Sequence, residues 1–239
     1  MNRCDRRHGV PHVCARNVPI FAALDEEGLA EVNSLIQSLS YGKGELLFNQ
    51  GDVGTHLYIV RSGRVKLYNV SAEGRQQILR ILSHGDFFGE LTLFQDTRQF
   101  CYAETMETSD ICQLRQADFR ALLGREPKVA MALLEAMSVR LSQAESFISD
   151  LTLKTVEERL ISWLMMKAQT GVKMGQEVEI TLDLNREELA HLLGTTIETV
   201  SRRLNGLQAD GVLTLHGHRS LVINDMDGLE ALLFSQKVI

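Results

Sequence analysis

The sequence predicts an α+β protein in which one long helix joins a small antiparallel β-domain to a compact helical domain. Residues 41–114 form short apolar runs broken by glycine, whereas apolar residues beyond Pro127 recur at helical spacing. A length of 239 residues fits one large domain or two modest ones, and it favours two. We therefore expect an N-terminal domain over residues 1–128, a long helix over 129–152 and a C-terminal domain over 153–239.

Composition and charge exclude several classes of protein. The chain is 44% hydrophobic and 23% charged, with 18 Gly and 3 Pro, so it is neither disordered nor collagen-like. Its 25 Lys and Arg against 31 Asp and Glu give a net charge of -6, so any contact with nucleic acid has to be local. No apolar run reaches the roughly 18 residues of a bilayer span, and residues 1–28 are too polar for a signal peptide. We expect a cytoplasmic protein without a membrane partner.

The N-terminal domain is expected to be a β-barrel or β-roll that follows a short helix. Residues 57–60 and 65–68 carry strand-forming side chains around the turn Arg61-Ser62-Gly63, which predicts a hairpin. Further strands at regular spacing indicate a closed sheet. Before them, residues 25–38 have apolar side chains at helical spacing and acidic residues where a helix begins.

The apolar residues of the long helix repeat every 3.5 residues over three heptads. A strict seven-residue repeat keeps one narrow seam toward a partner helix, whereas a helix on its own domain shows a broader stripe. We therefore predict a homodimer; the alternative, a long helix packed within one chain, stays open because three heptads is the minimum for a coiled coil. The predicted dimerisation residues are Leu134, Met137, Leu141, Ala144, Ile148 and Leu151.

Residues 185–207 predict two helices joined by a tight turn. Ala190 has a small side chain that allows the helices to cross closely, and Gly194 permits the positive φ that ends the first helix. Val200 places an apolar side chain of the second helix against the first. This spacing is that of a helix-turn-helix, whose second helix enters the DNA major groove. Residues 212–223 then predict a hairpin that serves as a wing. The alternative is a helical hairpin that only packs within the protein.

The second helix carries side chains suited to DNA. Glu198, Ser201 and Arg202 share one face and offer a carboxylate for cytosine N4, a hydroxyl, and a guanidinium for guanine or phosphate. Arg203, on a neighbouring stripe, is suited to a phosphate. A solvated helix face has the same composition, so this alternative stays open. The predicted DNA-binding residues are Thr196, Glu198, Thr199, Ser201, Arg202, Arg203 and Arg219.

From about Val18 onward the sequence resembles the CRP/FNR family of bacterial transcription regulators. The resemblance is carried by Gly44-Glu-Leu-Leu-Phe-Asn-Gln-Gly-Asp, Leu57-Tyr-Ile-Val-Arg-Ser-Gly and Gly85-Asp-Phe-Phe-Gly-Glu-Leu, with the long helix and winged helix-turn-helix in the family's order. It implies a sensory β-roll of the cyclic-nucleotide-binding type and a dimeric, non-enzymatic regulator. The implied partners are palindromic double-stranded DNA and RNA polymerase.

Within the family, the run Glu198-Thr-Val-Ser-Arg is similar to the FNR branch, whose Glu, Ser and Arg read the half-site TTGAT. The implied operator is TTGAT, four spacer bases and ATCAA. We expect an activator from this branch, although the sequence leaves activation and repression open. It also leaves open which redox state binds DNA.

The resemblance argues against a cyclic nucleotide as the ligand. In family members that bind cyclic AMP, an Arg for the phosphate stands ten residues after the Glu of Gly-Glu-Leu, and a Ser or Thr follows it. Counting from Glu90, those positions hold Phe100 and Cys101. An anion without an opposing cation binds poorly. Arg98 shares the strand face of Phe100, so a nucleotide or another small ligand stays an alternative.

The cysteines imply a redox or oxygen sensor. Cys112 lies in a run similar to that of the central cysteine of FNR-type oxygen sensors, and Cys14 lies where those sensors place their last N-terminal cysteine. A four-iron cluster needs four thiolates, and the N-terminus offers only Cys4 and Cys14, so we favour no metal or cofactor. The alternative is a 4Fe-4S cluster held by Cys4, Cys14 and Cys112.

The resemblance is closer to FNR-like regulators that use dithiol and disulfide exchange. Basic neighbours of Cys4 favour its reactive thiolate. We favour a bond between Cys4 and Cys112, with Cys14 as the alternative partner, because sequence does not give connectivity. Cys101, on an expected strand, is predicted to be structural. A protein without any regulatory cysteine remains a further possibility.

Overall fold

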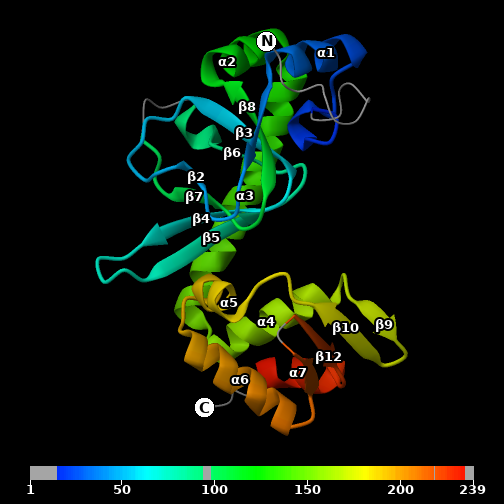
Figure 1. Cartoon of the computed structure of the whole chain (residues 1–239). Coiled ribbons are helices and arrows are strands. Elements are labelled where there is room, and N and C mark those ends of the chain that lie inside the picture. Colours follow the sequence, from blue (N-terminus) through cyan, green and yellow to red (C-terminus); the bar gives the residue numbers. More distant parts are fainter. Residues whose placement is uncertain (1–14, 94–97, 218, 235–239) are drawn as a thin grey trace. The chain divides into compact units, whose positions relative to one another are not determined.

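The protein is described by a computed structural model, which covers residues 15–93, 98–217 and 219–234. The chain divides into two compact units, Met1–Val70 with Ile78–Gln143 and Ser71–Gln77 with Ala144–Ile239 (Figure 1). The first unit contains a β-roll, and the second contains a helical bundle with a small sheet. The predicted α+β class is confirmed.

Two four-stranded sheets form the β-roll, in the orders β1-β8-β3-β6 and β2-β7-β4-β5. The strands are β1 (Gln37–Tyr41), β2 (Leu46–Phe48), β3 (His56–Ser62), β4 (Val65–Val70), β5 (Gln76–Leu82), β6 (Phe87–Phe88), β7 (Tyr102–Thr105) and β8 (Ser109–Arg115). The helical segments of this part of the chain are η2 (Pro19–Phe21), α1 (Glu26–Leu35), η3 (Glu90–Thr92) and α2 (Gln116–Arg125).

The predicted hairpin of residues 57–60 and 65–68 is wrong in its pairing. Both segments are strands, β3 and β4, but they belong to different sheets. Gly63 turns the chain from one sheet into the other with φ of 79°, and a Cβ there would lie 2.8 Å from the Cα of Ser109. Residues 61–64 therefore form a corner of the roll, because this close approach leaves room only for glycine.

Alternate residues of β8 enter two different apolar clusters. Ile111 lies in the roll interior with Phe48, whereas Cys112 lies in the other cluster with Phe21 of η2 and Phe119 of α2. This period of two is the ordinary geometry of a strand buried on both faces.

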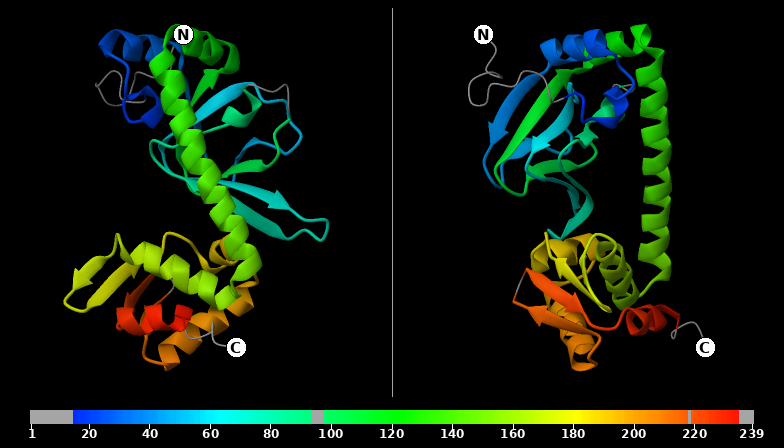
Figure 2. Two further views of the ribbon diagram at one scale, coloured as in Figure 1. Left: turned by 180° about the vertical axis from the view of Figure 1, so that it is seen from behind. Right: turned by 90° about the vertical axis from the view of Figure 1, so that its right-hand side faces the viewer.

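One continuous helix, α3 (Pro127–Leu153), follows the roll (Figure 2). Val129 and Leu133 are buried, and Met137 packs on the same cluster of the first unit. In contrast, Leu134, Leu141 and Ile148, spaced seven residues apart, are 60%, 61% and 61% exposed. Of the other seam residues, Ala144 is exposed and Leu151 is half-buried. The helix thus buries one stripe within its chain and leaves an apolar stripe uncovered.

In the described part of the second unit, the end of α3 is followed by four helices and a four-stranded sheet in the order β11-β12-β10-β9. Its elements are α4 (Val156–Ala168), β9 (Val172–Met174), β10 (Glu177–Thr181), α5 (Arg186–Leu193), α6 (Ile197–Ala209), β11 (Leu213–His216), β12 (Ser220–Ile223) and α7 (Met226–Phe234). The predicted wing hairpin is β11 and β12, which pair antiparallel. Among the described residues, no helix has the length and apolar character that crossing a membrane requires.

Candidate nucleic-acid interface

Local side-chain chemistry sets the two helices of the helix-turn-helix. Asn185 and Glu188 form a reciprocal capping box: the Asn185 side chain accepts from the Glu188 amide at 2.8 Å, and the Glu188 carboxylate accepts from the Asn185 amide at 2.8 Å. Gly194 ends α5 in the left-handed conformation, with φ of 66°. Ala190 and Val200 are buried where the helices cross. The predicted helix-turn-helix is confirmed.

The recognition helix α6 has a buried face and an exposed face. Val200, Leu204 and Leu207 are buried. At 3.6 residues per turn, Glu198 and Arg202 point away from that face, and both are exposed. Neither side chain makes an ion pair or a hydrogen bond within the described part of the chain. Ser201 lies half-buried beside them, so the three predicted base-reading residues share one side of the helix.

Two other predicted residues begin the recognition helix. The hydroxyl of Thr196 caps α6 by accepting from the Thr199 amide at 3.3 Å, and the two hydroxyl oxygens are 3.0 Å apart. The first amides of a helix have no partner within the helix, so this end of α6 is suited to an anion such as a DNA phosphate.

The two remaining predicted arginines differ in their surroundings. Arg219 is exposed in the turn of the wing, and its backbone carbonyl accepts from the Leu182 amide at 2.7 Å. Arg203 instead forms an ion pair with Glu157 of α4, with Nη1 and Oε2 2.9 Å apart. Sequence reasoning did not identify Glu157, because the contact joins two helices that are distant in the chain.

In the β-roll, the glutamate of the Gly-Glu-Leu motif forms an ion pair with an arginine of the same chain. Glu90 is 5% exposed, and its Oε1 lies 2.7 Å from Nη1 of Arg140 on α3. Arg140 also donates to the Phe87 carbonyl at 2.7 Å and lies 3.8 Å from the centre of the Phe87 ring. Arg80 is 3.9 Å from the same carboxylate, and burial lowers the pKa of its guanidinium. Sequence reasoning did not identify Arg140 either.

The positions where a cyclic phosphate would need its cation are unsuited to it. Phe100 is 47% exposed, and Cys101 is buried. The guanidinium of Arg98, the remaining candidate, donates to the Gly51 carbonyl at 2.8 Å. Neither of the two residues at the positions that the motif assigns to the phosphate is therefore a cation.

Of the three predicted redox cysteines, Cys4 and Cys14 lie outside the described residues, and Cys112 lies within them. Cys112 is fully buried on β8. Cys101 is 1% exposed in the roll interior, and burial raises the pKa of its thiol to about 12. A reactive thiolate is therefore disfavoured at Cys101. Within the described residues, no three His, Cys, Asp or Glu side chains are grouped as a metal site.

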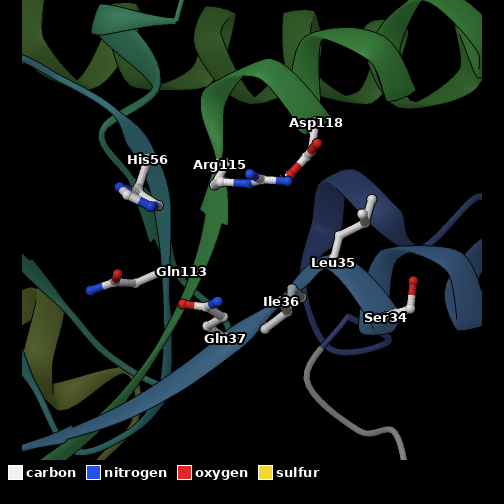
Figure 3. Close-up of a pocket in the computed structure, with 8 residues that line it drawn as sticks. All are labelled: Ser34, Leu35, Ile36, Gln37, His56, Gln113, Arg115 and Asp118. Atoms are coloured by element: carbon white, nitrogen blue, oxygen red, sulfur yellow. Dashed lines mark hydrogen bonds and ion pairs between the residues drawn. The ribbon is translucent and has the colours of Figure 1, made fainter. Parts of the chain in front are cut away.

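A cavity of about 280 Å³ opens beside α1 and α2 (Figure 3). Its charged side chains pair with each other, Arg115 with Asp118 at 2.7 Å, and Gln113 donates to the Tyr41 hydroxyl at 2.8 Å. His56 lies 2.8 Å from the Thr55 hydroxyl, and burial lowers the pKa of its imidazole. The lining therefore lacks an unpaired charge that would select a ligand.

A winged helix-turn-helix joined to a β-roll and a long helix is the architecture of a DNA-binding transcription regulator. Comparison with known families agrees with this class: a model described as cyclic nucleotide-binding domain matches residues 38–126, and one described as Crp-like helix-turn-helix domain matches residues 158–232.

Similar proteins and structures place the chain more narrowly. It is 32% identical to the cyclic AMP receptor protein of Thermus thermophilus over 216 residues, 90% of this chain and 97% of the relative. It is 29% identical to the fumarate and nitrate reduction regulatory protein of Salmonella typhimurium, over 87% of this chain and 84% of that protein. The FixK2 structure from Bradyrhizobium japonicum has a TM-score of 0.71 and 27% identity, covering 82% of this chain and 96% of its own. The chain belongs to the CRP/FNR family of transcription regulators.

Proposed function

We propose that the protein is a homodimeric, non-enzymatic regulator that reads TTGAT-type half-sites through Glu198, Ser201 and Arg202. The observation that carries this proposal is the exposed pair Glu198 and Arg202 on α6, which is unengaged within the described residues. Their carboxylate and guanidinium match cytosine N4 and guanine O6 and N7. Thr196, Thr199 and Arg219 contact phosphates. The proposal also includes RNA polymerase as a protein partner, activation of transcription as the result of DNA binding, and a cytoplasmic location of the protein.

The operator is tested by fluorescence anisotropy with a duplex carrying TTGAT, four spacer bases and ATCAA. We expect tight binding to this duplex, and a loss of about 1–3 kcal/mol for each substituted half-site base pair. Equal affinity for a scrambled duplex of the same composition, measured at the same salt concentration, contradicts the proposed operator.

A second copy of this chain is the proposed occupant of the exposed stripe on α3. Leu134, Leu141 and Ile148 are large apolar side chains that keep a seven-residue spacing while exposed. Two such stripes bury one another in a parallel pair of helices. Palindromic half-sites also require two recognition helices related by a two-fold axis.

We expect Leu141→Glu to give a monomer by light scattering and to lose binding to the palindrome. A carboxylate in the seam of each helix is desolvated next to its like-charged counterpart, which opposes pairing. Val139→Glu is the matched control, because Val139 is 58% exposed but lies on another side of the helix, two residues from Leu141. A Leu141→Glu protein that remains dimeric contradicts the proposed interface.

A dithiol switch that involves Cys112 is the proposed sensor. The proposed partner of Cys112 is Cys4, whose basic neighbours favour the reactive thiolate, with Cys14 as the alternative. Cys101 belongs to a different apolar cluster from Cys112, on the opposite side of the sheet. This separation argues against Cys101 as a fourth ligand beside Cys112, which supports a dithiol switch over a four-thiolate iron-sulfur cluster.

We expect oxidation with diamide to remove two thiols per chain, counted in denaturant because Cys112 is buried. Cys4→Ser and Cys112→Ser should abolish this loss, whereas the control Cys101→Ser should retain it. Loss of the effect in Cys14→Ser but not in Cys4→Ser assigns the bond to Cys14 instead. Iron and sulfide should be absent from an anaerobic preparation. Unchanged thiol counts, or stoichiometric iron with sulfide, contradict the dithiol switch.

A further inference from the structure

The recognition helix carries a cation that is already paired within its own domain. Arg203 of α6 and Glu157 of α4 form an ion pair with Nη1 and Oε2 2.9 Å apart, and their side chains are 46% and 24% exposed. The adjacent Arg202 makes no such contact within the described residues. The two neighbouring arginines of α6 therefore enter a DNA complex in different electrostatic states.

Helix geometry places Arg203 on the flank of α6. Arg202 points away from the buried residues Val200, Leu204 and Leu207. Arg203 follows it about 100° further around the helix, which turns its side chain toward α4. A helix that lies in the major groove has a phosphate backbone along each flank. The flank that carries Arg203 therefore faces phosphates rather than base edges.

The ion pair opposes a phosphate contact at this flank. A free guanidinium beside the backbone attracts phosphate and releases counterions, whatever the DNA sequence. The carboxylate of Glu157 neutralises that charge, and DNA phosphate has to compete with it for Arg203. We propose that Glu157 is a positioning residue that withholds Arg203 from the DNA backbone. It thereby lowers sequence-independent affinity and leaves discrimination to the side chains on the exposed face.

Glu157→Gln tests this proposal, because glutamine keeps the shape of the side chain and removes its charge. In the full-length protein, we expect the affinity for an operator duplex and for a scrambled duplex to rise by the same factor, roughly five- to tenfold per subunit at 0.1 M salt. The slope of log K against log salt should steepen by about 0.9 per subunit. The scrambled duplex makes the result independent of the proposed operator.

Arg203→Met separates this role from a direct contact. In the wild-type protein it should change the affinity less than twofold, whereas in the Glu157→Gln protein it should remove the whole gain. If Arg203→Met weakens the wild-type protein as much as the variant, then Arg203 already holds a phosphate and the proposal is overturned.

Glu230→Gln provides the matched control for net charge, because Glu230 is an exposed carboxylate on α7 of the same domain. We expect it to leave the salt slope unchanged. A gain in Glu230→Gln equal to that in Glu157→Gln overturns the proposal, because overall charge would then explain both. The ion pair is partly exposed and contributes little to stability, so circular dichroism should show all variants folded.

Discussion

Replacing either Arg202 or Glu198 by alanine is expected to abolish sequence-specific DNA binding and to leave the fold intact. Both side chains project from the N-terminal half of α6 into solvent, so their removal leaves no buried partner. Each base-specific contact contributes about 1–3 kcal/mol of discrimination. A dimer loses the contact in both half-sites, so the penalty doubles to about 2–6 kcal/mol, at least roughly thirtyfold in affinity.

The measurement compares operator and scrambled duplexes in anisotropy titrations at one salt concentration. Gln176→Ala is the control, since Gln176 is exposed in the turn between β9 and β10, outside the helix-turn-helix. It should keep wild-type affinity for both duplexes. Proteins lacking Arg202 or Glu198 that retain the wild-type preference for the operator would show that other residues read the bases.

The helix-turn-helix could be predicted from the sequence because its signals are local. The capping pair Asn185 and Glu188 and the left-handed Gly194 each act within a single helical turn, and the structure places them as expected. The same holds for the wing, where strand-forming residues flank a short turn. Short-range interactions join residues that are a few positions apart, so their spacing can be recognised in a single sequence.

Contacts between distant segments could not be predicted in this way. β3 and β4 have the composition of a hairpin, but the close approach of Gly63 to Ser109 sends them into different sheets. Glu157 and Glu158 are identical neighbours. Glu158 caps α4 with Thr155, which the spacing could have indicated, whereas Glu157 pairs with a residue of another helix. Only the fold distinguishes their roles.

The long helix shows a related limit of sequence periodicity. The heptad pattern indicates that α3 has an apolar seam, but a pattern does not say which stripe faces the protein's own core. The structure separates them: Val129 and Leu133 are buried in the chain, while Leu134 and Leu141 remain exposed. Met137, predicted in the seam, packs on the core of its own unit. A helix with two apolar stripes can pack on its own roll and on a partner at once.

Replacing Arg140 by methionine is expected to destabilise the first unit by about 3 kcal/mol. The substitution removes the nearer counter-ion of the buried Glu90 carboxylate and leaves only Arg80, at 3.9 Å. The Oε2 atom of Glu90 is already buried without a hydrogen-bond partner among the described residues. Arg140 also donates to the Phe87 carbonyl and covers the Phe87 ring. Its loss therefore removes an ion pair, a hydrogen bond and a cation–π contact together.

A double-mutant cycle in urea unfolding, followed by circular dichroism, tests whether the ion pair is the cause. Arg140→Met with Glu90→Gln should be more stable than Arg140→Met alone, because glutamine has no charge to bury. Arg75→Met is the control: Arg75 is 80% exposed beside Glu73, and a surface pair contributes only about 0–1 kcal/mol. If Glu90→Gln gives no rescue, then packing against Phe87, rather than charge compensation, accounts for the contribution of Arg140.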